Sequence, residues 1–157
     1  MPSKPATKSR YATRNADKMW TDEERAAMQE SARERRAASR RGSADERAAG
    51  EGEVQAKIAE LPPSERVVAA RVHEIISSSA PALVPRTYYG MPAYARDGKV
   101  ICFFQSPSKF KVRYATLGFQ PDARIDDGEM WPIAFAVTKL TPAVERQMAA
   151  LVKKAVG

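Results

Sequence analysis

The stretch YYGMPAYARDGKVICFF, residues 88–104, decides the fold of this chain. Its centre, Arg96-Asp97-Gly98-Lys99, predicts a two-residue hairpin loop, because Asp-Gly tolerates the positive φ angles that such a loop requires. The segment after the turn, Val100–Gln105, is apolar on both faces and predicts a central strand. The segment before it, Arg86–Tyr94, contains a glycine and a proline, which favour an edge strand or a bulge.

Two more strands are expected beyond this hairpin. In residues 109–114 the cations Lys109, Lys111 and Arg113 alternate with larger apolar and aromatic side chains. A period of two with one charged face predicts an antiparallel strand, which can continue to Phe119. Residues 133–138 predict the last strand of the sheet.

Helices are expected on both sides of these strands. A capping box at Thr21–Glu24 predicts a helix over residues 21–41. This helix has no continuous apolar stripe, so we expect it to be solvated or to need a partner. Apolar spacing predicts further helices over residues 54–61 and 64–79, and a Thr-Pro start predicts the closing helix from Thr141.

The first third of the chain cannot form a core of its own. Residues 1–53 contain no Val, Ile, Leu or Phe, whereas ordering the backbone costs about 1–2 kcal/mol per residue. We therefore expect a charged N-terminal extension, partly helical or disordered, over residues 1–53. Residues 54–157 are expected to form one α+β domain, a small antiparallel sheet packed with helices. Three glycines in residues 42–52 predict a linker.

The composition and motif content of the chain limit the classes of function that we expect. The net charge of +7 suits a mildly basic protein and also a polyanionic partner. The single cysteine, Cys102, excludes an internal disulfide and is expected to be a small core residue. The only histidine, His73, is expected at the surface or half-buried. No P-loop, GxSxG or HExxH template is present, so we expect no enzyme. No apolar run suits a membrane, so a cytoplasmic location is expected.

Several motifs together resemble a known family. The segments YYGMPAYARDGKVICFF, YATLGF, DDGEMWPIAFA and LVKKAVG are similar to the bacterial YdhG-like family of domains of unknown function. One branch of that family has been described as frataxin-like iron chaperones. The resemblance covers about residues 57–157 and implies a compact α+β domain without established enzymatic activity. It provides no ligand motif that can be transferred residue by residue.

Four carboxylates form the candidate metal site, since hard cations and iron accept oxygen ligands. They are Asp122, Asp126, Asp127 and Glu129. The alternative interpretation is that they are turn or capping residues. The residues themselves fix no cofactor, and iron is the one that the resemblance suggests.

Two other groups of residues could bind a ligand. The cations Lys109, Lys111 and Arg113 form a candidate surface for nucleic acid or another anion, or a solvated sheet face. Aromatic side chains could line a small-molecule pocket or pack in the core. The pocket candidates are Tyr89, Tyr94, Tyr114 and Trp131.

Three functions remain open at this point. The first is a small non-catalytic protein that binds iron and delivers it to an accepting protein. The second is a nucleic-acid-associating protein that uses its basic N-terminal arm and the strand cations. The third is a small-ligand-binding module. We expect a monomer or a homodimer and no membrane partner.

Overall fold

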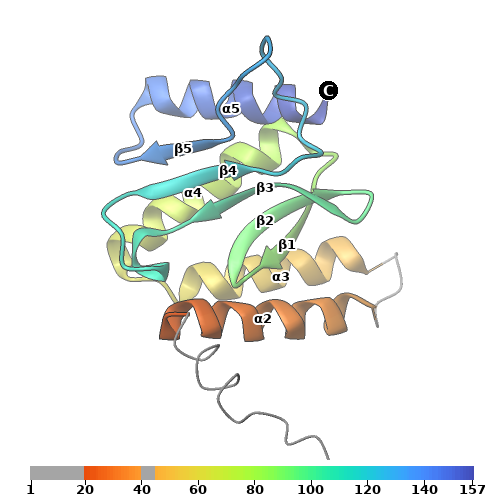
Figure 1. Cartoon of the computed structure of the whole chain (residues 1–157), viewed down its shortest axis with the longest axis vertical. Helices are drawn as coiled ribbons and strands as arrows, with labels where there is room; N and C mark the ends of the chain where they lie inside the picture. The colour runs from red at the N-terminus through yellow and green to blue at the C-terminus, as the bar shows by residue number, and fades with distance from the viewer. Residues whose placement is uncertain (1–19, 40–44) are drawn as a thin grey trace, which may run out of the picture.

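The structure is a computed structural model that describes residues 20–39 and 45–157. One five-stranded antiparallel sheet, in the order β1-β2-β3-β4-β5, packs with helices (Figure 1), which confirms the expected α+β class. The strands are β1 Val84–Tyr88, β2 Met91–Arg96, β3 Lys99–Gln105, β4 Ala115–Phe119 and β5 Ala134–Val137. The helices are α2 Asp22–Ser39, α3 Glu46–Ala59, α4 Pro63–Ser79 and α5 Pro142–Val156, with a short 3₁₀ helix η1 at Pro107–Lys109.

Two tight turns connect the first three strands. Asp97 and Gly98 have φ angles of 52° and 77°, which confirms the expected hairpin between β2 and β3. Tyr89 and Gly90 form a second turn of the same kind, with φ angles of 50° and 75°. The segment expected to be one interrupted strand is therefore the hairpin of β1 and β2.

The central position of β3 explains its apolar composition. The register between β2 and β3 shifts after Tyr94, so that β3 has one extra residue, Ile101, opposite the bulge. Such a bulge lets two consecutive residues point to the same side. Ile101 and Cys102 are accordingly both buried in the main core.

The core lies between one face of the sheet and helices α3, α4 and α5. Val54, Val72, Leu117 and Val152 are almost completely buried there, and α4 runs behind the sheet while α5 lies beside β5 (Figure 1). α5 begins as expected, since the Thr141 hydroxyl accepts a hydrogen bond from the Val144 N–H at 3.2 Å. The opposite sheet face is therefore left without α4 or α5 against it.

The prediction of a strand is wrong for residues 109–114, whereas its continuation to Phe119 is confirmed as β4. Lys109 ends η1, Lys111 has a φ angle of 54°, and the Val112 N–H bonds back to the Pro107 carbonyl at 3.0 Å. These residues form a compact loop, and β4 begins only at Ala115. The alternation of charged and apolar residues therefore does not produce a charged strand face.

The linker expected over residues 42–52 is helix α3 from Glu46 onward, while residues 42–44 lie outside the described residues. The expected boundary at 53/54 thus falls inside α3, which packs against β1. Gly50 is buried at this contact, because a Cβ on Gly50 would lie 2.8 Å from the Pro85 carbonyl carbon and nearer still to its oxygen. The glycine permits close packing of a helix on a strand.

The predicted helix is confirmed as α2, and it packs against β1 and α3 of the same domain. The Glu24 N–H donates to the Thr21 hydroxyl at 3.1 Å, as expected of the N-cap. α2 lies beside α3 at the β1 edge of the sheet (Figure 1). Its buried side chains among the described residues are Ala27 and Ser31, both small. No large apolar side chain of α2 is fully buried in the described residues, and ion pairs from Glu23 and Glu30 add to its attachment.

Candidate binding site on the open sheet face

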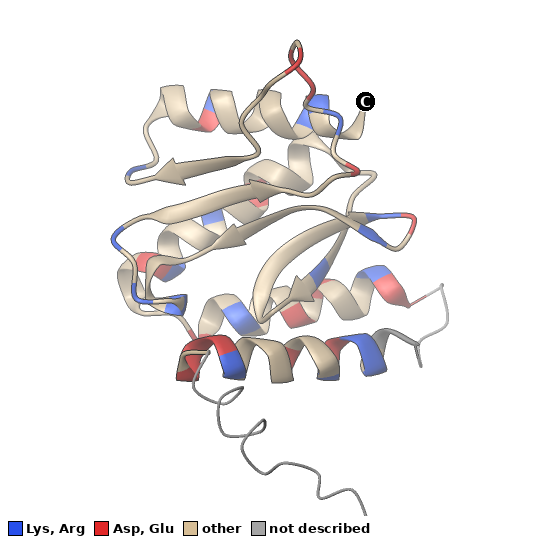
Figure 2. Ribbon diagram, viewed as in Figure 1, with Lys and Arg blue, Asp and Glu red and all other residues tan. Residues whose placement is uncertain are grey.

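Charged residues lie around the sheet more than within its strands. Figure 2 marks their positions along α2, at the turn between β2 and β3, and in the loops, whereas most strand positions are uncharged. We next describe where this arrangement places the residues of each expected site.

The three cations of the expected anion surface have separate partners. Lys109 pairs with Glu30 of α2 at 3.2 Å, and Lys111 pairs with Glu23 of the same helix at 2.5 Å. The Arg113 guanidinium lies over the Tyr114 ring, 5.3 Å from its centroid. These residues form no common row, because the segment that carries them is a loop.

The four candidate metal ligands lie in the loop between β4 and β5, here called the acidic loop, and all four are exposed. Asp122 pairs with Lys99 at 3.7 Å. Within residues 20–39 and 45–157, no group of three or more His, Cys, Asp or Glu side chains is placed to hold a metal ion. Iron binding stays a hypothesis that rests on the resemblance.

The four candidate pocket aromatics are spread over the molecule. Tyr89 lies in the turn between β1 and β2, Tyr114 precedes β4, and Trp131 is half-buried before β5. Tyr94 is in the core, where its hydroxyl contacts His73 Nδ1 at 2.8 Å. The expectation of a common pocket for these four is therefore not met.

His73 is buried, which corrects the expectation of a surface or half-buried side chain. Its Nε2 lies 2.7 Å from a Glu51 carboxylate oxygen, and its Nδ1 faces Tyr94. Both ring nitrogens are thus occupied inside the fold. Cys102 is also buried, as expected, and burial raises the pKa of its thiol to about 12.

A cleft of about 330 Å³ opens on the free sheet face, between α2 and the loop that follows β4. Arg86 and Tyr88 of β1, Lys99 at the start of β3 and Tyr89 in the turn all line it. By the strand register, Arg86 lies opposite Ala93, a small residue that leaves room beside the larger side chains. We call this the sheet-face cleft.

An aromatic group continues this face of the sheet. Tyr88 contacts Tyr89 edge-to-face at 4.6 Å and Phe103 at 5.8 Å between ring centroids. The Phe103 ring lies over Gly118, where a Cβ would come 2.8 Å from Cε2 of the ring. Burial, with a contribution from Tyr89, raises the pKa of the Tyr88 hydroxyl, which therefore remains a hydrogen-bond donor at neutral pH.

The carboxylates that line the cleft already have partners within the protein. Of its carboxylates, Asp122 pairs with Lys99, and Glu34 accepts the Gly90 N–H at 2.9 Å. Arg86 lines the same cleft and is half-buried. A guanidinium beside aromatic rings is suited to a flat anionic group, because it binds carboxylate, sulfonate or phosphate oxygens in a bidentate geometry.

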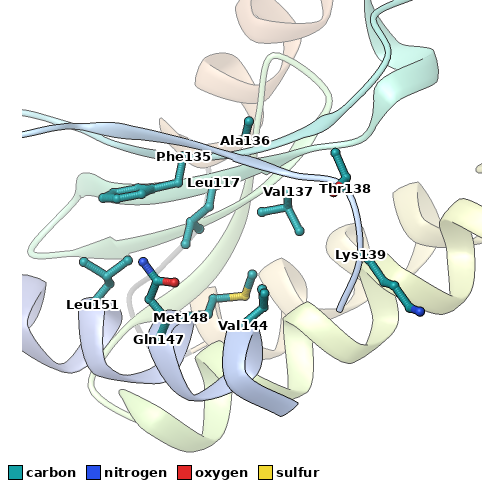
Figure 3. A pocket seen from close by; sticks show the side chains of 10 residues that line it. All are labelled: Leu117, Phe135, Ala136, Val137, Thr138, Lys139, Val144, Gln147, Met148 and Leu151. Carbon is teal, nitrogen blue, oxygen red and sulfur yellow. The ribbon is translucent and has the colours of Figure 1, made fainter. Parts of the chain in front are cut away.

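A second cavity, of about 150 Å³, lies between β5 and α5 (Figure 3). Leu117, Phe135, Met148 and Leu151 point into it from the sheet and the helix, and Gln147 lies at its side. Its lining is mostly aliphatic, and its volume is less than half that of the sheet-face cleft. We interpret it as incomplete packing at the sheet edge.

Sequence reasoning missed Arg86 and Lys99 as site residues. A usable signal was present, since Arg86 and Tyr88 are two apart and therefore share a strand face. The contribution of α2 to the cleft, through Ser31, Glu34 and Arg35, had no signal in the sequence because it depends on how the helix docks.

Comparison of the chain with protein-family models, curated proteins and solved structures finds no match. The resemblance to the YdhG-like family therefore stays a hypothesis. No helix in the described part of the chain combines the length and the apolar composition that a bilayer-spanning segment needs.

Proposed function

We propose that this protein is a non-catalytic binding module whose sheet-face cleft binds a small molecule with a flat ring and a negative charge. The supporting observation is the placement of Arg86 and Lys99 beside Tyr88 in one cleft of about 330 Å³. Stacking on the tyrosine ring would hold the flat part of the ligand. The guanidinium would hold its anionic group.

The chemistry of the interior supports a binding role. A cysteine acts as a nucleophile through its thiolate, and the thiol of Cys102 is buried with its pKa raised to about 12. A general base must reach a substrate proton, and His73 is buried with both ring nitrogens occupied. Neither residue is placed to react with a molecule in the cleft.

The test uses 2-naphthalenesulfonate as a flat anionic probe and 2-naphthol as its uncharged counterpart. Titration followed by amide chemical shifts should show the sulfonate binding more tightly, with changes centred on Tyr88 and Lys99. Arg86→Gln should weaken sulfonate binding about tenfold, equivalent to about 1.4 kcal/mol, because a charge-assisted hydrogen bond is lost.

The matched control is Arg146→Gln, which removes the same charge from an exposed position on α5. This variant should bind the sulfonate as the wild type does. Equal losses in the two variants would indicate non-specific attraction, and equal binding of sulfonate and naphthol would show that the cleft does not select anions. Either result would refute the proposal.

A further inference from the structure

Five donor groups converge beside the turn between β1 and β2. They are the Thr87 hydroxyl, the Tyr89 and Gly90 N–H groups, and the ammonium groups of Lys57 and Lys109. Backbone N–H groups exposed by a tight turn, together with ammonium groups, are the donors that proteins use for phosphate. We call these five groups the donor cradle.

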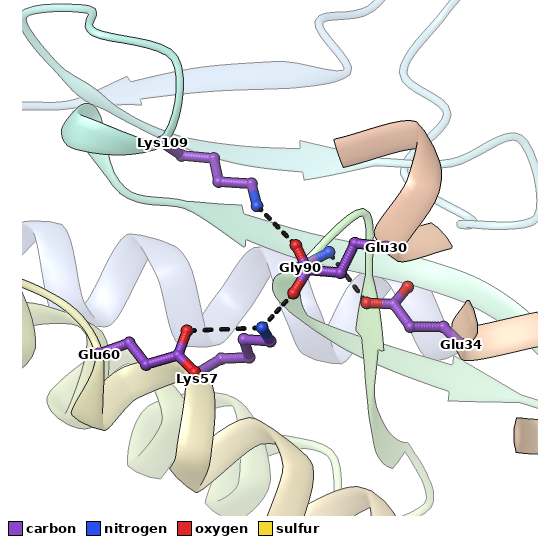
Figure 4. Close-up of polar contacts among 6 residues, drawn as sticks. All are labelled: Glu30, Glu34, Lys57, Glu60, Gly90 and Lys109. Carbon is purple, nitrogen blue, oxygen red and sulfur yellow. Dashed lines mark hydrogen bonds and ion pairs between the residues drawn. The ribbon is translucent and has the colours of Figure 1, made fainter. Parts of the chain in front are cut away.

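Two carboxylates of α2 occupy the donor cradle (Figure 4). Glu34 accepts the Gly90 N–H at 2.9 Å, and the Thr87 hydroxyl and the Tyr89 N–H act on the same carboxylate to lower its pKa. Glu30 directs one oxygen to Lys57 and the other to Lys109. Lys57 also reaches Glu60 of α3 at 3.4 Å.

The cradle is built closely around these anions. A Cβ on Gly90 would lie 2.6 Å from the Glu30 carboxylate carbon, so the glycine leaves the space that the carboxylate fills. The side chains of Glu30, Lys109 and Lys57 are 17%, 22% and 29% exposed. Two partly buried ammonium groups beside one carboxylate would repel each other if no anion lay between them.

The two carboxylates are spaced like two anionic groups of one linear ligand. Glu30 and Glu34 are four residues apart on a helix, which places their Cβ atoms about 5–6 Å apart on the same face. Burial raises the pKa of Glu34 despite its hydrogen bonds, whereas the bonds from Lys57 and Lys109 outweigh burial and lower the pKa of Glu30. The cradle therefore stabilises negative charge most strongly at its lysine end.

The helix that supplies these carboxylates has no large apolar side chain that is fully buried. Its buried side chains, Ala27 and Ser31, are small, and Glu23 adds an exposed ion pair with Lys111. Exposed ion pairs contribute little free energy and weaken with salt. A ligand with more negative charge than two carboxylates can therefore compete with α2.

We infer that the donor cradle is a binding site for a linear polyphosphate group, which α2 occupies with Glu30 and Glu34 when that group is absent. The helix then acts as an internal competitor, and ligand binding releases it. Glu34 lines the sheet-face cleft as well, but the inference is argued from the donor groups and does not rest on the ligand proposed for that cleft.

The test is calorimetric titration of the full chain with inorganic tripolyphosphate. Glu30→Gln keeps the size of the side chain but removes the competing charge, so tripolyphosphate should bind about tenfold more tightly than to the wild type. Adding Lys109→Gln to that variant should remove the gain. Orthophosphate should show a smaller gain, because it can fill only one half of the cradle.

Glu24→Gln is the matched control, since it removes the same charge from α2 at a residue outside the donor cradle. Equal affinity of the Glu24 and Glu30 variants for tripolyphosphate would overturn the inference in favour of net charge. Failure of every variant to bind would also overturn it. If Glu30→Gln does not fold, Glu34→Gln tests the turn end of the cradle and should show the same direction of change.

A nucleoside triphosphate in the same titration identifies the source of the phosphates. Equal affinity for tripolyphosphate and adenosine triphosphate indicates that the donor cradle contacts only the phosphate groups of the ligand. Tighter binding of the nucleotide indicates that its base adds a contact. Both results support the cradle, whereas loss of the Glu30→Gln gain with both ligands contradicts it.

Discussion

Two glycines in α3 provide a matched test of how this helix packs. A Cβ on Gly50 would lie 2.8 Å from the Pro85 carbonyl carbon, whereas a Cβ on Gly52 would meet nothing within 4 Å. Both replacements by alanine gain about 1 kcal/mol of helix propensity. Only Gly50→Ala forces α3 away from β1, and overpacking of this kind costs about 1–3 kcal/mol.

The expected net effects therefore have opposite signs. Gly50→Ala should lower the free energy of unfolding by up to about 2 kcal/mol, which is the overpacking cost less the propensity gain. Gly52→Ala should raise it by about 0.5–1 kcal/mol. In a chain of this size the melting temperature should fall by about 5 °C in the first variant and rise by about 2 °C in the second.

Urea unfolding of both variants, followed by circular dichroism, measures the two free energies directly. Similar stabilisation by both alanines would show that α3 does not lie against β1 at Gly50. Destabilisation by both alanines would show that Gly52 does not lie at an open position of the helix.

Further predictions concern the core, the donor cradle and the loops. Tyr94→Phe should cost about 1–2 kcal/mol in urea unfolding, because His73 Nδ1 loses its buried partner. The pKa of Glu30 is lowered in the fold, so its contribution is present above about pH 4.3 and lost as pH falls; the stability gap between wild type and Glu30→Gln should shrink in acid. Val144→Leu should stabilise by about 0.5–1 kcal/mol by filling the cavity at β5. Replacing all four carboxylates of the acidic loop with amides should leave Fe(II) and Fe(III) affinity in calorimetric titration unchanged.

The sequence predicted the elements whose signals are local. Asp97-Gly98 has the positive φ angles that its turn requires, and Thr141 caps α5 through a residue three positions away. β3 is central because apolar residues on both faces need burial on both faces. In each case the information lies within a few residues of the structure that it determines.

The errors arose where distant contacts override local pattern. Residues 109–114 alternate as a strand does, yet Lys109 and Lys111 turn to glutamates of α2 that are far away in the chain. Gly50 resembles a linker residue, but its lack of a side chain is what β1 requires. The donor cradle could not be predicted, because α3, the β1–β2 turn and η1 must first fold together.

Amide hydrogen exchange of the wild-type chain tests the occupation of the cradle by α2 most directly. In buffer, the backbone amides in the middle of α2 should be protected. Saturating tripolyphosphate should accelerate their exchange while those of α4 remain unchanged, because the ligand replaces Glu30 and Glu34 and leaves the core intact. Unchanged protection of α2 in the presence of bound tripolyphosphate, or equal acceleration in α2 and α4, would contradict the account.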